Sequence, residues 1–141
     1  MVERIKTARP DATIGADLIA GFPTESEDAA HNTLRLLDDC EVIAGHIFPF
    51  SPRPGTPAAR MPQLERETIK ARAARLRERA TERRSAWLSS QVDSVQRVLT
   101  ENGNKAHTDG FAPVRLDMPN GHVIHVRITG ATADHLIGAP V

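Results

Sequence analysis

The chain has 141 residues, of which 40% are apolar and 26% charged, a balance that indicates a folded protein and excludes a disordered one. Eighteen basic residues offset eighteen acidic ones, so affinity for nucleic acid has to come from local clusters of charge. One cysteine, Cys40, cannot build a disulfide framework, a zinc site or an iron–sulfur site alone. No apolar run is long enough for a membrane span or a signal peptide, which predicts a reduced, cytoplasmic protein without a membrane partner.

The first predicted elements form a strand–helix–strand unit. Residues 13–20 read TIGADLIA, a short apolar run that predicts a parallel strand buried on both faces. Thr24 and Glu27 have capping-box spacing, which predicts a helix beginning there, and a second apolar strand follows from Val42 to Phe50. Because two parallel strands make no core by themselves, we expect a larger domain around this unit.

A long helix is predicted from Glu65 to Gln91, after a loop over 51–62 that four prolines and a glycine constrain. Its apolar stripe consists of Ile69, Ala73, Leu76, Ala80 and Trp87. Beside this stripe lies the arginine row: Arg72, Arg75, Arg79 and Arg83. Such a row can neutralise RNA phosphates, and the alternative is a solvated helix face with intrahelical ion pairs.

After Gln91 the apolar residues alternate with polar ones, over 114–118 and again over 124–128, with Pro119-Asn120-Gly121 between them. This pattern predicts a small antiparallel barrel or sandwich, with a domain boundary near Gln91. A basic surface is expected from Lys105, His107, Arg115, His125 and Arg127. Phe111 is the only aromatic residue in this region, which favours contact with an RNA backbone over stacking on bases.

Two loops are candidates for ligand binding because they follow the predicted parallel strands, where α/β folds hold ligands. The first is Gly21-Phe22-Pro23, after the strand that carries Asp17. A glycine allows close backbone approach, and the N-terminus of the next helix favours an anion. The alternative for Asp17 is a turn cap or a structural ion pair. In the second loop, Arg53 can pair with a carboxylate or phosphate, or remain solvated.

Two segments carry a family resemblance: GADLIAGFPTE at 15–25 and HIFPFSPRPGTPAARMP at 46–62. Together they resemble the second half of the radical S-adenosylmethionine (SAM) barrel in the tRNA methylthiotransferase family. The alternating C-terminal strands resemble that family's TRAM module, a small RNA-binding β-barrel. The resemblance covers essentially the whole chain. It implies an α/β partial radical SAM barrel with a long connecting helix over residues 1–91, followed by an all-β TRAM barrel over residues 92–141.

The resemblance also implies a function for the parent enzyme. Members of the branch with a His-x-Phe-Pro-aromatic lead-in, as at His46–Phe50, add a methylthio group at carbon 2 of threonylcarbamoyladenosine in the tRNA anticodon loop. They use SAM and [4Fe–4S] clusters. The alternatives are the isopentenyladenosine branch and a non-catalytic RNA-binding remnant. Contacts with SAM are expected from Asp17, Gly21, Phe22, Pro23, Ser51 and Arg53, and contacts with tRNA from the arginine row, Lys105, Arg115 and Arg127.

The chain departs from the family at its cysteines. The CxxxCxxC loop is absent, as is the N-terminal domain with three further cysteines, and Cys40 matches neither motif. We therefore expect no catalytic residue and no metal site in this chain, and no turnover by the chain alone. The missing part would come from the N-terminal region of the enzyme or from another chain. Cys40 is interpreted as buried helix packing.

Overall fold

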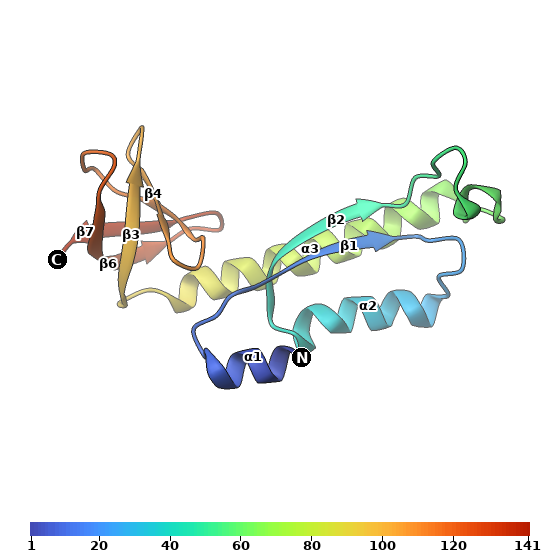
Figure 1. Ribbon diagram of the computed structural model, residues 1–141, viewed down its shortest axis with the longest axis horizontal. Helices are drawn as coiled ribbons and strands as arrows, with labels where there is room; N and C mark the ends of the chain where they lie inside the picture. The colour runs from blue at the N-terminus through green and yellow to red at the C-terminus, as the bar shows by residue number, and fades with distance from the viewer. The chain divides into compact units, whose positions relative to one another are not determined.

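The computed structural model describes all of residues 1–141, which divide into two compact units. The first consists of Met1–Arg4 and Thr13–Arg83, and the second of Ile5–Ala12 and Arg84–Val141. A short helix, α1 (Val2–Ala8), precedes the elements that the sequence predicts (Figure 1). None of the helices combines the length and the apolar character needed to cross a membrane.

The first unit contains the predicted strand–helix–strand. Its elements are β1 (Ile14–Ala20), α2 (Glu27–Asp39), β2 (Val42–Pro49), a short 3₁₀ helix (Pro57–Arg60) and most of α3 (Arg66–Ser90). β1 and β2 pair in parallel and form a two-stranded sheet. The bounds of α3 confirm the predicted long helix to within one residue at each end.

Helices α2 and α3 pack against one face of the β1–β2 sheet and enclose the core of the first unit. The buried members of this core are Ala20, Leu37, Val42, Ala73, Leu76 and Ala80. Ala73, Leu76 and Ala80 come from the predicted apolar stripe of α3, which is confirmed at its centre. Full burial of a Leu or Val side chain contributes about 1.5–3 kcal/mol, so this face holds the helices on the sheet.

The opposite face of the β1–β2 sheet is exposed in this chain. Asp17 lies opposite His46, and Ile19 lies opposite Phe48, with Ile19 58% and Phe48 52% exposed. The prediction that residues 13–20 form a strand buried on both faces is therefore wrong for this chain, because both helices cover the same face. The apolar composition of residues 13–20 predicts a strand, but it does not show which face of the strand the neighbouring helices cover.

Helix α2 begins at a different residue from the one predicted. Its N-cap is Ser26, not Thr24, and the Ser26 hydroxyl accepts a hydrogen bond from the backbone N–H of Ala29 (3.1 Å). Cys40 is the C-cap residue of α2. It packs against the core of the first unit but is only half-buried, so the interpretation of Cys40 as buried packing is confirmed for the contact and wrong for full burial.

The second unit contains a closed five-stranded barrel in the order β3-β4-β5-β7-β6. The strands are β3 (Val95–Glu101), β4 (Lys105–Thr108), β5 (Pro113–Arg115), β6 (Val123–Ala131) and β7 (Leu136–Pro140). β5 and β7 pair in parallel and the other neighbours pair antiparallel, so the barrel is mixed. The expectation of an antiparallel barrel is corrected in this respect, since residue alternation fixes the inward face of a strand but not its direction.

The barrel has its own apolar core, and the inward residues of its strands are fully buried. Its largest buried side chains are Val98, Val114, Val126, Ile128 and Leu136, together with Leu88 at the end of α3. Closure of the barrel leaves no free strand edge, which removes the usual route to edge-to-edge aggregation.

Candidate functional site

The turn after β1 is closed by a glutamate of its own and packs against α3. The backbone N–H of Gly21 donates to Oε2 of Glu25 (2.9 Å), and the N–H of Glu25 donates to the carbonyl of Phe22 (2.8 Å). Gly21 has a φ of 82°, and a Cβ at this position would lie 2.7 Å from the side chain of Ile69. Both the left-handed backbone and the close helix therefore require glycine here.

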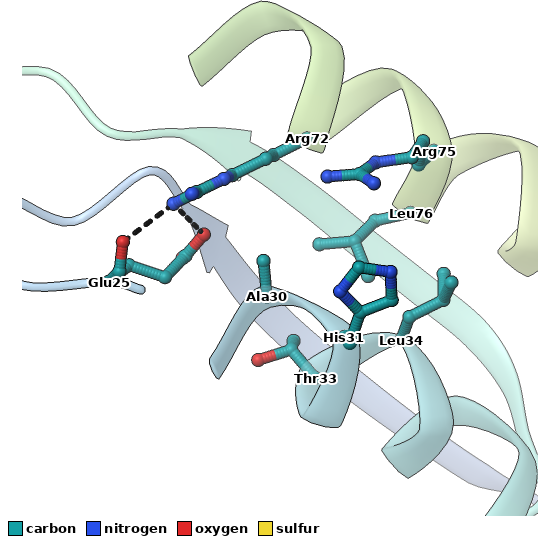
Figure 2. A pocket seen from close by; sticks show the side chains of 8 residues that line it. All are labelled: Glu25, Ala30, His31, Thr33, Leu34, Arg72, Arg75 and Leu76. Atoms are coloured by element: carbon teal, nitrogen blue, oxygen red, sulfur yellow. Dashed lines mark hydrogen bonds and ion pairs between the residues drawn. The ribbon is translucent and has the colours of Figure 1, made fainter. Parts of the chain in front are cut away.

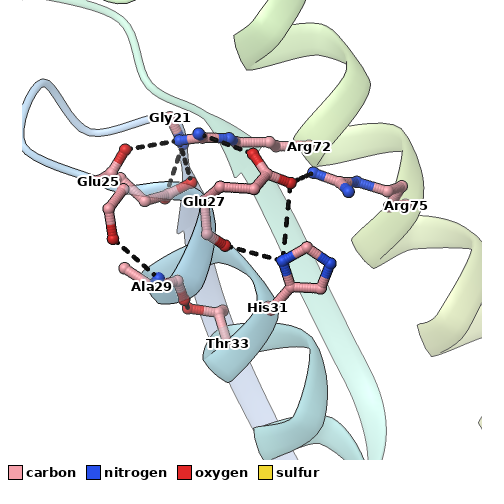
Figure 3. Close-up of polar contacts among 9 residues, drawn as sticks. Gly21, Glu25, Glu27, Ala29, His31, Thr33, Arg72 and Arg75 are labelled. Atoms are coloured by element: carbon pink, nitrogen blue, oxygen red, sulfur yellow. Dashed lines mark hydrogen bonds and ion pairs between the residues drawn. The ribbon is translucent and has the colours of Figure 1, made fainter.

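A buried ion pair ties this turn to α3 (Figure 3). The side chains of Arg72 and Glu25 are only 8% and 11% exposed. Nη1 of Arg72 donates to Oε1 of Glu25 (2.9 Å) and to its carbonyl oxygen (2.7 Å), and Nη2 donates to Oε2 of Glu27 (3.0 Å). Loss of Arg72 would leave the Glu25 carboxylate buried without a counter-charge, so the pair fixes the turn against the helix.

Glu27, in the first turn of α2, is shared by two arginines. Besides Arg72, Nη2 of Arg75 donates to Oε1 of Glu27 (2.7 Å), and Nδ1 of His31 lies 3.7 Å from the same oxygen. The hydrogen bond from Arg75, and then that from Arg72, hold the pKa of the Glu27 carboxyl below its usual range. The carboxylate therefore stays ionised where both guanidinium groups need it.

Asp38, near the end of α2, has the same role for the rest of the arginine row. Nη2 of Arg79 and Nη1 of Arg83 donate to Oδ1 of Asp38 (2.8 and 2.9 Å), and Nε of Arg83 donates to the carbonyl of Val42 (3.0 Å). The hydrogen bond from Arg79 is the main cause of a lowered pKa at Asp38, with a smaller contribution from Arg83.

The arginine row is thus occupied by acceptors of its own unit. Arg72 is buried, while the side chains of Arg75 and Arg79 remain 44% and 41% exposed. An RNA phosphate approaching this row has to compete with the carboxylates of α2 and of the turn before it. Contact between the row and RNA stays a prediction.

A small pocket lies between α2 and α3, beside these ion pairs (Figure 2). It is lined by Glu25, Ala30, His31, Thr33, Leu34, Arg72, Arg75 and Leu76. The guanidinium groups of Arg72 and Arg75 are already paired with Glu25 and Glu27. The pocket therefore presents no uncompensated cation to an anionic ligand, and its geometry is that of a gap between two packed helices.

Five of the six residues predicted to contact SAM lie in two loops that meet at one end of the sheet. Gly21, Phe22 and Pro23 follow β1, and Ser51 and Arg53 follow β2. The N–H of Phe50 donates to the carbonyl of Ala20 (2.7 Å), and the Phe22 and Phe50 rings pack edge to face with centroids 5.3 Å apart.

Asp17 lies away from these loops, in β1 on the exposed face of the sheet. Its carboxylate has no hydrogen bond or ion pair within the chain, so it is neither a turn cap nor part of a structural ion pair in this structure. Arg53 is exposed, and only its carbonyl is engaged, by the Thr56 hydroxyl (2.8 Å). Both charges are available to a ligand.

The two cofactors implied by the resemblance fit this chain differently. An open carboxylate at Asp17, with apolar side chains at Ile19 and Phe48 on the same sheet face, suits a ligand with a cationic and an aromatic part, as SAM is. A [4Fe–4S] cluster does not fit. The chain contains one cysteine, and no three His, Cys, Asp or Glu side chains are gathered in a way that can hold a metal ion.

In the barrel, the structure brings two of the three predicted RNA-binding residues together. Lys105 on β4 lies directly opposite Arg115 on β5, and both are exposed. We refer to this pair as the hairpin cations. Arg127 lies on β6, separated from β5 by β7, and one of its Nη atoms is 3.5 Å from the carbonyl oxygen of Asp93.

The carboxylates that pair with the arginine row are Glu25, Glu27 and Asp38, and the sequence does not predict these pairs. Glu25 belongs to a motif that gives it no role, Glu27 is predicted only as part of a cap, and no role is predicted for Asp38. The sequence carries only a weak signal, which is that several acidic residues precede a helix with four regularly spaced arginines. Sequence separations of 41 to 48 residues between the partners hide the pairing from local pattern analysis.

Comparison with known proteins reveals relatives along nearly the whole chain, although no family model matches it. The chain is 38% identical, over 91% of its length, to threonylcarbamoyladenosine tRNA methylthiotransferase MtaB of Rickettsia prowazekii. It is 37% identical, over 99% of its length, to tRNA-2-methylthio-N(6)-dimethylallyladenosine synthase of Nitrosomonas europaea. The relatives of this chain are tRNA methylthiotransferases.

A protein of Chromobacterium violaceum with the same synthase name is 38% identical over 98% of the chain. The similarity covers 31%, 32% and 34% of these three relatives, so the chain spans about a third of the length of the curated relatives that it matches. Both substrate names occur among them, so the methylthiotransferase family fits the chain while its nucleoside substrate is left open between two branches.

Proposed function

We propose that this chain supplies part of a tRNA methylthiotransferase: the closing strands and helices of a radical SAM barrel over residues 1–91, and a TRAM barrel over residues 92–141. Similarity to tRNA methylthiotransferases along 91% to 99% of the chain carries this proposal. The parallel β1–β2 pair with its open face supports the first half, and the closed five-stranded barrel supports the second.

The proposed parent enzyme adds a methylthio group at carbon 2 of threonylcarbamoyladenosine in the anticodon loop of tRNA, in the cytoplasm. The Rickettsia prowazekii relative carries this nucleoside in its name. The alternative substrate is isopentenyladenosine, which the dimethylallyladenosine names of the Nitrosomonas europaea and Chromobacterium violaceum relatives support.

Within that enzyme we assign contact with SAM to six residues: Asp17, Gly21, Phe22, Pro23, Ser51 and Arg53. Asp17 offers a carboxylate to the cationic part of SAM, Gly21 lets the turn pack closely against Ile69 of α3, and Arg53 offers a guanidinium to a carboxylate or phosphate. SAM, when bound, is the source of the transferred methyl group and of the radical. Ligands for the [4Fe–4S] clusters have to come from sequence outside this chain, and no step is assigned to them here.

The tRNA contacts in this proposal are Lys105, Arg115 and Arg127 on the barrel. The arginine row of α3, which the sequence predicts as a second surface, stays outside this proposal because its members are paired with carboxylates of the first unit. The hairpin cations support the barrel contact, because each lacks a carboxylate partner. Phosphate contacts of this kind make binding salt-dependent.

Mass spectrometry of tRNA nucleosides tests the proposal, in cells with and without the gene that encodes this chain. Loss of 2-methylthio-threonylcarbamoyladenosine, with accumulation of its unthiolated precursor, is expected. Loss of 2-methylthio-isopentenyladenosine instead would assign the chain to the other branch. If both nucleosides remain unchanged, the methylthiotransferase role is contradicted and a non-catalytic RNA-binding role takes its place.

A further inference from the structure

Phe111 is exposed at a position where the barrel gains nothing from an aromatic side chain. It lies in the loop between β4 and β5 and is 79% exposed. Its neighbour Ala112 and the preceding Thr108 are buried and fill the barrel end without it. No other residue of 92–141 is a phenylalanine, tyrosine or tryptophan. A single exposed apolar side chain is ordinary on a protein surface, so the case for a role of Phe111 depends on the backbone of its loop and on the charges beside it.

The backbone of Phe111 is also strained. Its φ is 60°, in the left-handed region that a bulky side chain rarely adopts. Three hydrogen bonds hold the loop: the N–H of Phe111 donates to the Thr108 carbonyl (2.9 Å), the N–H of Thr108 donates to the Ala112 carbonyl (3.0 Å), and the N–H of Ala112 donates to the Thr108 hydroxyl (3.0 Å). These bonds fix the backbone from which the ring projects, and strain kept without a gain in packing points to function.

The same hairpin carries two cations without acceptors. Lys105 and Arg115 lie directly opposite each other, an arrangement of like charges that costs stability. Glu101, opposite Lys105 on β3, pairs with His107 instead (2.9 Å) and does not neutralise them. Lys105 precedes Thr108, the last residue of β4, by three positions, which is roughly 10 Å along a strand. The β4–β5 hairpin thus combines an exposed ring at its tip with two unpaired cations at its base.

We propose that Phe111 stacks on an unpaired base of a single-stranded RNA whose backbone phosphates contact the hairpin cations. An aromatic platform beside cations is how single strands are bound without reading sequence, because every base has a stacking face. A duplex offers no such base, since its bases are already stacked on each other. The inference rests on the proposed function only in taking RNA as the ligand, and it replaces the expectation of backbone contact alone.

The test uses the whole 141-residue chain and a single-stranded oligoadenylate that carries one 2-aminopurine, whose fluorescence falls when the base stacks. The wild-type chain is expected to quench this fluorescence and to bind a duplex RNA of equal length more weakly. Phe111→Asn is expected to lower affinity about tenfold at an unchanged salt slope, and Phe111→Trp to retain affinity. Lys105→Gln is expected to lower the salt slope by roughly 0.7, the value of one phosphate contact on a single strand.

Thermal unfolding of the same variants separates stacking from a structural role. Asn adopts the left-handed region more readily than Phe, so the Phe111→Asn variant should keep or raise Tm while it loses RNA affinity. Absence of RNA binding by the wild-type chain, unchanged affinity in Phe111→Asn, or loss of affinity accompanied by a fall in Tm would each overturn the inference. Nucleoside mass spectrometry does not depend on Phe111, so this inference and the proposed methylthiolation can fail separately.

Discussion

Two groups of cations in this chain have opposite surroundings. Every member of the arginine row donates to a carboxylate of the first unit, and Arg72 is buried with its partner. The hairpin cations of the barrel have no such acceptor. In the sequence the two groups look alike, as basic residues on an amphipathic element. The partners of a charge, and not its presence, therefore decide whether it is available to RNA.

The arginine row and the hairpin cations are therefore expected to have different roles. Removing a member of the arginine row breaks bonds inside the folded chain, so the main effect should be on stability. Removing a hairpin cation breaks no bond and relieves a like-charge contact, so the main effect should be on RNA binding. The following predictions test this division, beginning with the largest effect.

The largest expected loss of stability comes from Arg72→Ala. This change leaves the Glu25 carboxylate buried without its guanidinium. It should therefore lower the free energy of local unfolding of α2 by about 3–5 kcal/mol. Hydrogen exchange of the α2 amides measures this free energy. Arg66→Ala, at an exposed position of the same helix without a carboxylate partner, is the matched control and should cost less than about 1 kcal/mol. Equal effects of the two changes would refute the structural role of Arg72.

The next largest effect is expected at the turn that Arg72 and Glu25 hold. Gly21→Ala combines left-handed strain with a clash against Ile69 at 2.7 Å, and should destabilise the first unit by about 3 kcal/mol. Gly55→Ala has the same strain, at a φ of 85°, but no atom within 4 Å, so it should cost only about 1 kcal/mol. Hydrogen exchange of the β1 amides measures both, and a cost at Gly55 equal to that at Gly21 would show that α3 does not press on the turn.

A smaller effect is expected from pH. The arginine hydrogen bonds lower the pKa of Glu27 and Asp38 below their ordinary values of 4.5 and 3.8, so both carboxyls bind protons more readily in the unfolded chain. Their contribution to stability is complete above pH 4.5 and declines as pH falls through the lowered values. Urea unfolding followed at α2 should show this decline, and an Asp38→Asn variant should show less of it. A profile that Asp38→Asn leaves unchanged would contradict the assignment.

The sequence predicted the secondary-structure elements of this chain better than the contacts between them. Local periodicity gave the bounds of α3 and the inward residues of the barrel strands, because both follow from the period of a single element. Local periodicity did not identify Ser26 as the N-cap of α2. Thr24 and Ser26 both precede suitable acidic residues, and only the turn formed by Phe22 and Glu25 distinguishes the two candidates. The parallel pairing of β5 with β7 was not predicted, because the relative direction of two strands depends on the path of the chain between them.

The candidate site was predicted only in part, because its loops follow from local motifs whereas its buried ion pair does not. The motif residues after β1 and β2 were recognisable as ligand loops, and parallel pairing of the two strands does bring Phe22 and Phe50 together. The buried partnership of Glu25 with Arg72 spans 47 residues and leaves no local pattern. The strained backbone of Phe111 is likewise invisible in its sequence, because Asp109-Gly110-Phe111 reads as an ordinary turn in which glycine would take the left-handed position.

The most direct test of the contrast between the two groups of cations is the salt dependence of tRNA binding by the whole chain. Lys105→Gln with Arg115→Gln should lower the slope of log K against log salt by about 1.5, the value of two phosphate contacts, without loss of Tm. Arg75→Gln with Arg79→Gln, the two exposed members of the arginine row, should leave the slope unchanged. A fall in slope for the arginine pair and none for the hairpin cations would contradict the account.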